Sequence, residues 1–576
     1  MKNISIQVLL GLALVTQLSS CEVDRYPENT VSDDNFWNSV EDVRLVANYF
    51  YTKLPGLATA DVEMDNWGVD GYQNDKGNST SDGSRVAPAT STDYDYSNIY
   101  QANKLIEKAS EVIAKGADAK LVNWYVAEAR FFRAWFYFEM FKRFGGVPII
   151  TKTMGVSDPD IFKARATREE VLQLIYDDLD YAIATLRSAD QLSSAKDYGR
   201  ISRTAALAFK SRVGLFEGTR AKFHGYGDAK KHLTIARDAA RQVIDSKEHA
   251  VFSTPVIGEN GKVSNEAYYN LFQEAGEGRA NKENIIVKQY GINLENSILI
   301  TPIQRYYEGG NIGATQNFVD NYLMIDGLPA KKSSYYIAPN AQMKHMEYFS
   351  MRDPRMGFTL FKSGDEFKGT GKYSVPNPTL QRTGFNIRKY ANAQYFETQR
   401  SFIDRPVLRY AEVLLNYAEA VYELDGVITD EQLNATINVL RKRLPEVNIG
   451  TLEEPEYAAM PSLSNAFVND NGLKMQDEIR RERRVELAYE GGMGYWDLIR
   501  WKTAEVEMVK PLLGSYFFLE YKAANWSANT PVDKDNYIVL QPANLRKFDP
   551  QKDYLWPLPT NEIAKNKEVL TQNPKW

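Results

Sequence analysis

The stretch from Asp118 to Gly146 constrains the fold more than any other part of the chain. Aromatic residues recur there at helical spacing and widen the apolar stripe to most of the helix surface: Phe131, Phe132, Trp135, Phe136, Tyr137, Phe138, Phe141 and Phe144. A helix that is apolar on most sides must be enclosed by neighbouring elements. Asp118 is a good N-cap, while Gly145 and Pro148 end the helix. The sequence therefore predicts a scaffold in which other helices surround this one.

Apolar periodicity predicts those other helices. They are expected near residues 35–54, 96–115, 167–187, 202–221, 228–245, 406–424, 429–443 and 472–501. Long helices with short links are typical of tetratricopeptide-like hairpins, with small residues at close contacts, here Ala127, Ala134, Ala205, Ala208, Ala239 and Ala240. Residues 60–95, 250–400 and 502–576 instead have loop-like composition. We predict a mainly α fold, a tetratricopeptide-like helical-hairpin scaffold with long irregular loop-rich insertions.

The N-terminus has the layout of an export signal. Lys2 is followed by an apolar run over residues 8–15 and by Leu18-Ser-Ser ahead of Cys21, the only cysteine in 576 residues. The run is shorter than the about 20 apolar residues that cross a bilayer. Its Leu-Ser-Ser-Cys ending resembles a bacterial lipobox. We predict a signal peptide over 1–20, acylation of Cys21, and a tether over 21–34 that holds the protein at a membrane surface.

Composition and motifs exclude several classes of function. A net charge of -6 without a basic tract argues against nucleic acid as a partner. An acylated Cys21 leaves no thiol for a disulfide, a metal site or a nucleophile. The four histidines form no zinc-hydrolase motif, and no nucleophile elbow, phosphate-binding loop, dinucleotide fingerprint or EF-hand loop is present. We predict no cofactor and no metal site; loop oxygens leave a structural Ca²⁺ open without predicting one.

One set of carboxylates allows an enzymatic alternative. Glu482, Glu486 and Glu490 are spaced four apart on one predicted helix, and two carboxyls on a shared face could serve glycoside hydrolysis. Arginines crowd the same turns, and Asp477–Arg481 and Arg483–Glu486 are expected helix ion pairs. Such ion pairs usually stabilise the fold, so we expect that the protein is not an enzyme.

Two polar loops that contain aromatic residues favour recognition of a carbohydrate. A sugar offers an apolar face to an aromatic ring and a fringe of hydroxyls to polar side chains. The stretches 63–85 and 303–322, together with the ring of Tyr94, supply both kinds of group. The predicted glycan-binding residues are Trp67, Asp70, Tyr72, Arg85, Tyr94, Arg305, Tyr306, Tyr307 and Asn311. The alternative is that these rings only pack the loops against the rest of the protein.

Five motifs in order resemble the SusD/RagB family, the surface glycan-binding lipoproteins of Bacteroidetes. They are the lipobox with Glu22 and Asp24; Tyr96-x-x-Ile99-x-x-Ala102-Asn103; the run from Glu128 to Pro148; the run from Arg405 to Ala420; and the run from Arg480 to Trp501, followed by Leu558-Pro559 and Asn573-Pro574. The resemblance implies an N-terminal helical region over 35–250. It also implies a C-terminal region over 251–576, loop-rich over 251–400, helical over 401–501 and an irregular cap over 502–576.

The same resemblance implies a function. Such a protein is a lid on the extracellular face of a SusC-like TonB-dependent transporter in the outer membrane, where it captures an oligosaccharide for import without catalysis. Many relatives carry a tryptophan where Thr92 stands here, so this chain is expected to use Tyr94 or Trp67, or to bind differently. The alternatives are a lid that binds peptides or another nutrient, a surface glycoside hydrolase using Glu482 and Glu486, and a scaffold that binds nothing.

Overall fold

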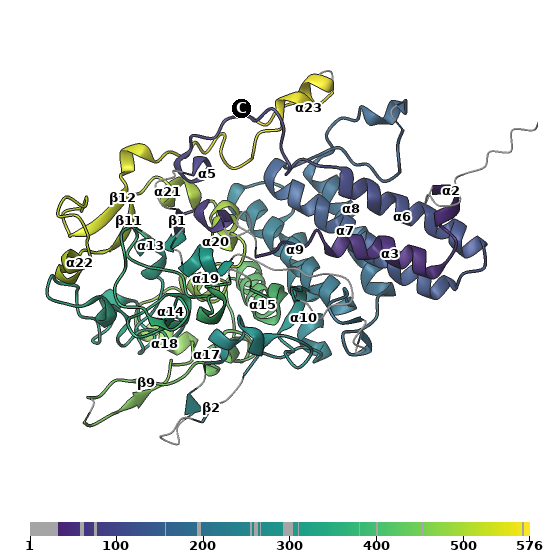
Figure 1. The fold of residues 1–576 in the computed structure, drawn as a ribbon. Helices are drawn as coiled ribbons and strands as arrows, with labels where there is room; N and C mark the ends of the chain where they lie inside the picture. Colours follow the sequence, from purple (N-terminus) through teal and green to yellow (C-terminus); the bar gives the residue numbers. More distant parts are fainter. Residues whose placement is uncertain are drawn as a thin grey trace, which may run out of the picture.

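The computed structural model describes residues 33–576 except 58–62, 74–77, 156, 193–196, 254–255, 258–262, 265, 292–302, 309, 311, 380, 399–400, 452 and 567–568 (Figure 1). Cys21, the signal peptide and most of the tether lie outside the described residues, as does Asn311. Across the described part, helices predominate and strands are few and short, which confirms the mainly α prediction.

Among the described residues, eight helices of at least three turns form the scaffold: α3 (Val40–Tyr51), α6 (Ser97–Ala114), α7 (Ala119–Phe144), α8 (Arg168–Thr185), α9 (Arg203–His224), α10 (Ala229–Ser246), α15 (Tyr410–Asp425) and α19 (Met475–Glu486). Helix α7 packs against α3, α6 and α8, so its aromatic surface is enclosed as the sequence predicts. The Asp118 carboxylate caps α7 by accepting the N–H groups of Lys120 (2.8 Å) and Leu121 (3.2 Å). Gly145 follows with φ 77°, the left-handed region that glycine favours.

The close approach of α9 and α10 depends on two glycines of α9 and not on the predicted alanines alone. All six alanines are buried. However, a Cβ on Gly214 would lie 2.9 Å from the backbone of α10, and one on Gly218 would lie 2.7 Å from the Leu233 nitrogen. The pair α9 and α10 in turn packs on α15, which joins the first helices to the C-terminal part of the chain.

Gly218→Ala should destabilise the protein although alanine is the better helix former. The gain in helix propensity is about 1 kcal/mol, whereas overpacking against backbone costs ~1–3 kcal/mol because backbone cannot move aside. The difference between the two terms predicts that the free energy of unfolding in urea falls by up to about 2 kcal/mol. Gly155→Ala, where a Cβ meets nothing within 4 Å, is the control and should change it little. Equal stability of the two variants would contradict the close approach.

The rest of the chain is built from short elements. The shorter helices are α2 (Asp33–Phe36), α5 (Ser79–Asp82), α11 (Ala267–Asn270), α12 (Ile303–Glu308), α13 (Gln316–Val319), α14 (Arg355–Thr359), α16 (Asp430–Asn434), α17 (Ile437–Lys442), α18 (Asn465–Asp470), α20 (Met493–Arg500), α21 (Ala504–Glu507), α22 (Leu519–Ala523) and α23 (Thr560–Lys565). Each described sheet has two antiparallel strands: β1 (Gly71–Gln73) with β5 (Ile312–Ala314), β2 (Val256–Ile257) with β3 (Val263–Ser264), β4 (Asn284–Lys288) with β8 (Arg405–Arg409), β6 (Glu366–Phe367) with β7 (Gly371–Lys372), β9 (Val447–Asn448) with β10 (Tyr457–Ala458), and β11 (Leu512–Tyr516) with β12 (Tyr537–Gln541).

Three predicted C-terminal helices are corrected. The segment 406–424 begins as strand β8 and becomes helical only at Tyr410. The segment 429–443 is broken at Thr436 into α16 and α17. The segment 472–501 is interrupted between α19 and α20, where Tyr489, Gly491 and Gly492 all adopt positive φ. These breaks redirect the chain, and the last one brings α20 beside the loop that contains Trp67.

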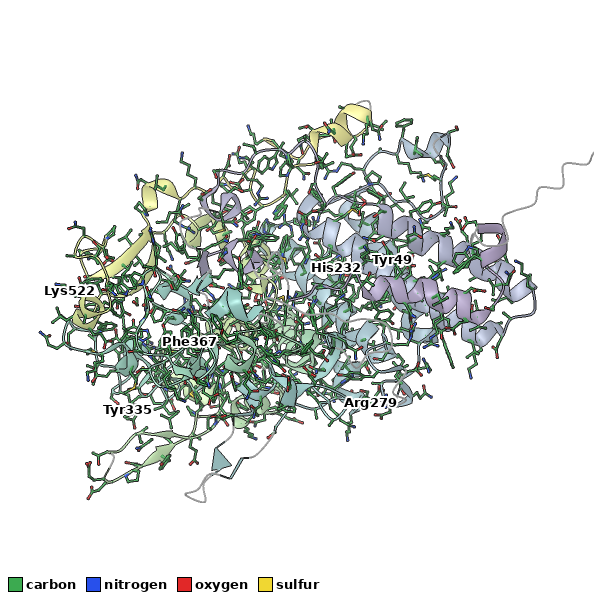
Figure 2. The ribbon with its side chains drawn as sticks, in the orientation of Figure 1. Tyr49, His232, Arg279, Tyr335, Phe367 and Lys522 are labelled. Atoms are coloured by element: carbon green, nitrogen blue, oxygen red, sulfur yellow. The ribbon has the colours of Figure 1, made fainter. Side chains whose placement is uncertain are left out.

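The two largest hydrophobic cores of the described residues correspond to the helical part and the loop-rich part of the chain. One joins the N-terminal helices to α15, α19 and α20, and the other fills the loop-rich part around Phe318, Phe385 and Tyr521. In Figure 1 the helical part lies on the right and the loop-rich part on the left, with α15 and α19 between them. Figure 2 places Tyr49 and His232 in the helical part and Tyr335, Phe367 and Lys522 in the other. Within the described residues, none of the helices combines the length and the apolarity that a membrane span requires.

Candidate functional site

A cavity of about 470 Å³ lies where the helical scaffold meets the loop-rich part, and we call it the central pocket. Its walls come from α7, α9, β8 and α20, from the chain after α3, and from the loops at residues 63–67 and 92–93. Five aromatic rings line it: Trp67, Trp135, Phe138, Phe216 and Trp496. Thr92 lines it too, so the residue at the position of the relatives' tryptophan and Trp67 share one pocket.

Trp67 is the half-buried ring of this set, and its orientation is fixed by other rings. It meets Trp556 edge-on at 5.0 Å, Tyr495 at 5.8 Å and Trp496 at 6.3 Å between ring centroids. The Arg143 guanidinium lies 5.7 Å from its centroid. A ring held in this way presents its remaining surface to the pocket with little loss of side-chain entropy on binding.

The loop that contains Trp67 is attached to the N-terminus of α20. The 3-10 turn η1 (Met64–Asn66) precedes Trp67, and the Asp65 carboxylate accepts the Gly492 N–H at 3.0 Å. The Ser81 hydroxyl donates to the Gly68 carbonyl at 2.8 Å on the other side of Trp67. Burial raises the pKa of Asp65 to about 7, against the opposing effects of the Gly492 hydrogen bond and the Arg405 charge.

Asp65→Asn should change how stability depends on pH. The folded-state pKa of Asp65 is raised above its ordinary value of 3.8, so its contribution to stability is fully present below that value and is lost as the pH rises through 7. Between pH 5 and 8 the free energy of unfolding of the wild type should fall by about 2–3 kcal/mol relative to the asparagine variant. Urea titrations at both pH values measure this difference; parallel pH profiles would contradict it.

The two loops predicted from sequence meet in the structure. Strand β1 of the first loop pairs with β5 of the second, with Tyr72 opposite Gly313. The Tyr306 hydroxyl donates to the Glu63 carboxylate at 3.1 Å and accepts from Gln73 at 3.3 Å. Because Glu63 lines the central pocket, Tyr306 lies one hydrogen bond behind its wall. The rings of both loops thus converge on one region.

The other predicted residues have structural partners. Asp70 pairs with Arg484 and accepts the Tyr489 hydroxyl through its carbonyl. The Arg85 guanidinium lies 4.2 Å from the Trp556 centroid, and Tyr94 packs edge-on against Tyr96 and Phe144. The residues that line the pocket do not include Arg85 or Tyr94.

Two predicted tyrosines and an arginine complete the set. Tyr72 is half-buried in β1, and Tyr307 is 1% exposed, so its ring is part of the core. Arg305 lies on α12, and Asn311 is outside the described residues.

Sequence reasoning missed the charged residues of the pocket wall. Glu139 and Lys142 pair at 2.9 Å and Glu139 and Arg143 at 2.9 Å, and Arg143 also pairs with Asp93 at 3.0 Å. Burial lowers the pKa of Lys142 to about 8, against the opposing pull of Glu139. Burial acts to raise the pKa of Glu139, but Lys142 and Arg143 outweigh it and bring the pKa to about 2. Glu139, Lys142 and Arg143 lie among the aromatic residues of α7, and the apolar character of that helix obscured their role.

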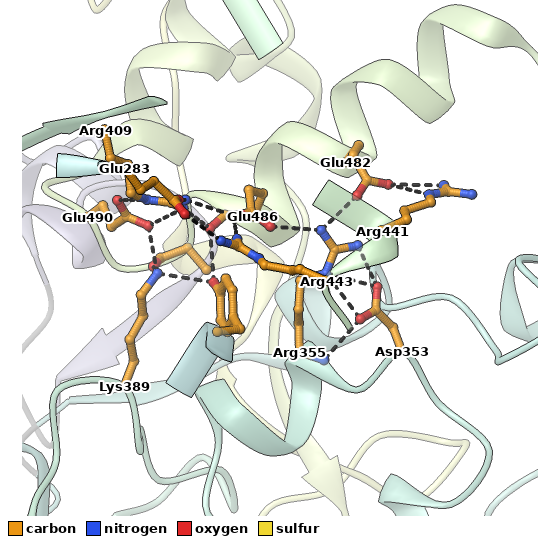
Figure 3. A network of polar contacts seen from close by, with 12 residues as sticks. Glu283, Asp353, Arg355, Lys389, Arg409, Arg441, Arg443, Glu482, Glu486 and Glu490 are labelled. Atoms are coloured by element: carbon orange, nitrogen blue, oxygen red, sulfur yellow. Dashed lines mark hydrogen bonds and ion pairs between the residues drawn. The ribbon is translucent and has the colours of Figure 1, made fainter. Parts of the chain in front are cut away.

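The carboxylates considered for hydrolysis lie in a buried ion network (Figure 3). Glu486 is 0% exposed and pairs with Arg409 at 2.7 Å, with Arg355 at 3.0 Å and with Arg443. Glu482 pairs with Arg355 at 2.7 Å and Arg441 at 3.0 Å. The network consists of Glu283, Asp353, Arg355, Lys389, Arg409, Arg441, Arg443, Glu482, Glu486 and Glu490.

This burial corrects the local pairs expected from spacing. Arg483 pairs with Asp497 at 3.0 Å and not with Glu486, and Arg481 pairs with Glu478 and not with Asp477. The first difference arises because the chain reverses after α19 and brings Asp497 against it. A glycosidase acid needs a raised pKa and access to substrate, whereas the pKa of Glu486 is held well below its usual range: burial acts to raise it, but the guanidinium groups outweigh burial.

The described residues contain no group of three or more His, Cys, Asp or Glu side chains arranged to hold a metal ion.

Comparison with known sequence families gives two matches. The sequence model described as "SusD family" matches residues 275–576, more than half of the chain. A second model, described as "Starch-binding associating with outer membrane", matches residues 29–215.

Relatives and solved structures agree with these matches. A SusD-like protein of Formosa agariphila is 28% identical over 544 residues, covering 89% of this chain and 94% of the relative. A second from the same organism is 23% identical over 588 residues and covers 97% of each chain. A SusD-like carbohydrate binding protein of Bacteroides fragilis has a TM-score of 0.70 at 20% identity, covering 93% of this chain and 99% of that one. A SusD homolog of Bacteroides thetaiotaomicron has a TM-score of 0.66 at 21% identity, covering 96% and 100%.

Proposed function

The chain belongs to the SusD family, and from this premise we propose that it is a glycan-binding lipoprotein that captures an oligosaccharide in the central pocket for uptake. The observation that carries the proposal is the position of Trp67, a half-buried indole fixed by three other rings at the wall of a 470 Å³ pocket. A sugar has an apolar face, which a fixed aromatic ring can contact, and hydroxyls at its edge, which polar side chains can bind. The pocket places both kinds of group together.

The resemblance of one solved structure, named as a carbohydrate binding protein, supports the ligand class. The neutralised carboxylates at Glu482 and Glu486 support binding without catalysis, because neither is free to act as an acid at the pocket. Trp67 takes the role expected of the missing tryptophan at Thr92. Glu63 adds a polar group to the pocket wall, and the Tyr306 hydroxyl behind the wall holds it by a hydrogen bond.

We further propose the setting that the family resemblance implies. Acylated Cys21 anchors the protein to the outer membrane, with the folded part on the extracellular face. A SusC-like TonB-dependent transporter is the expected partner, over which the protein acts as a lid. Tethering above the pore raises the effective concentration of the ligand, so micromolar affinity suffices for delivery.

Affinity electrophoresis of the mature protein against a polysaccharide panel tests the ligand class. Retarded migration in at least one polysaccharide gel is the expected result. Binding of peptides with no polysaccharide retained would move the assignment to peptide capture, and release of reducing sugars after long incubation would show an enzyme. Co-purification of a barrel protein from outer membranes tests the partner.

A further inference from the structure

The carboxylates of the central pocket are already engaged within the protein. Five line the pocket: Glu63, Asp93, Glu139, Glu490 and Asp497. Four of them are in ion pairs, with Arg143, Lys142, Lys389 and Arg483 respectively. Glu63 accepts hydrogen bonds from the hydroxyl of Tyr306 and the amide of Gln73. Four of these carboxylates are therefore balanced by basic side chains, while the hydrogen-bond donors to Glu63 are neutral.

The basic side chains of the pocket keep unused donors. Arg143 uses Nε for Asp93 and Nη1 for Glu139. Arg212 uses Nε and Nη2 for Glu412 and for the Val407 carbonyl. Among the described residues, Nη2 of Arg143 and Nη1 of Arg212 have no hydrogen-bond partner.

Two lysines add to this positive charge. The Lys142 ammonium makes one ion pair, with Glu139, and otherwise faces rings, 4.8 Å from the Trp496 centroid. Lys53 is exposed at the pocket and has no ion pair within the described part of the chain. Seven basic side chains line the pocket against the five carboxylates. Two further carboxylates behind the wall, Glu412 and Glu419, pair with Arg212 and Arg500.

Guanidinium and ammonium donors in a partly desolvated site bind anionic acceptors about twice as strongly as neutral ones. Sugar hydroxyls could also accept from the unused donors of Arg143 and Arg212, whereas a carboxylate or sulfate would accept from them and also attract the exposed Lys53 ammonium. Building on the glycan-binding function proposed above, we propose that the central pocket takes an acidic glycan. Its carboxylate or sulfate ester is bound by Lys142, Arg143 and Arg212, while one of its sugar rings lies on Trp67.

Matched pairs of polysaccharides test the proposal. The mature protein is assayed by affinity electrophoresis against homogalacturonan and alginate in native and carboxyl-reduced form, and against carrageenan in native and desulfated form. Starch and xylan are the neutral references. We expect at least one native acidic polysaccharide to bind about tenfold or more tightly than its neutralised form. The carboxylate and sulfate arms identify which anion is recognised.

Two lysine variants test whether the central pocket causes the tighter binding of acidic polysaccharides. Lys142→Gln should weaken binding of the acidic form about fivefold or more, and Lys53→Gln, at an exposed side chain that folding does not need, about twofold to threefold. Lys210→Gln is the matched control, because Lys210 lies on α9 but pairs with Asp180 on the outer surface. The proposal is overturned if both pocket variants bind the acidic form as tightly as the wild type, or if the native and neutralised forms bind equally. Either result leaves the proposed glycan binding intact. Retention of no polysaccharide at all overturns the proposed function as well.

Discussion

Replacing Glu486 with glutamine should lower the free energy of unfolding by about 3–5 kcal/mol. Glu486 is 0% exposed and is the carboxylate shared by Arg355, Arg409 and Arg443. A neutral amide cannot balance three guanidinium groups, and a buried charge that loses its partner is far more costly than a surface one. Urea unfolding followed by circular dichroism measures the effect.

A surface pair provides the control for this prediction. Lys565 and Glu562 form an exposed i,i+3 pair at 2.7 Å, and Glu562→Gln should cost less than about 1 kcal/mol. The folded-state pKa of Glu486 is held below its usual range, so its stabilising contribution is present above the ordinary glutamate pKa and lost as the pH falls toward the folded-state value. A Glu486→Gln variant as stable as Glu562→Gln would contradict the structural role of the network.

Trp67→Ala should weaken glycan binding by about 30-fold or more, which corresponds to about 2 kcal/mol. The indole is the half-buried ring of the central pocket, and other rings hold it in place before a ligand arrives. Its removal deletes both the stacking surface and the preorganised wall. Isothermal titration calorimetry with the polysaccharide that binds most tightly gives the ratio of dissociation constants.

Trp124→Ala is the control for Trp67→Ala. Trp124 is also a half-buried indole, with the Arg187 guanidinium 4.5 Å from its ring, but it lies near the start of α7 and outside the pocket. Its replacement should leave the affinity unchanged within about twofold. Similar losses from the two variants would show that the effect comes from stability and not from contact with the ligand.

The helices of the scaffold could be predicted because local chemistry defines them. Thr167, Ser202 and Asp228 cap α8, α9 and α10 as their sequence positions indicate. The break at Thr436 could not be predicted, because no Gly or Pro marks it. The break around Gly491 does carry a local signal, the pair Gly491-Gly492, which the prediction of one helix over 472–501 overlooked. Strand β8 could not be predicted either, because its apolar residues fit a helix stripe but pair with a strand more than 100 residues earlier.

Aromatic residues of the candidate site could be predicted from the sequence, but its charged residues could not. Trp67 was identified because a ring in a polar loop is conspicuous, whereas Lys142 was hidden within an apolar helix. Tyr306 and Tyr307 are both buried in the same core, 8% and 1% exposed, and spacing alone cannot show that the Tyr306 hydroxyl reaches Glu63 at the pocket wall. The partners of Glu486 come from three distant segments, so no pattern on α19 indicates them.

The position of a bound oligosaccharide tests the central claim most directly. A crystal structure of the mature protein with its tightest-binding oligosaccharide should show a sugar ring against the Trp67 indole, inside the pocket bounded by α7, α9 and α20. An oligosaccharide bound elsewhere on the protein, with the central pocket unoccupied, would contradict the account.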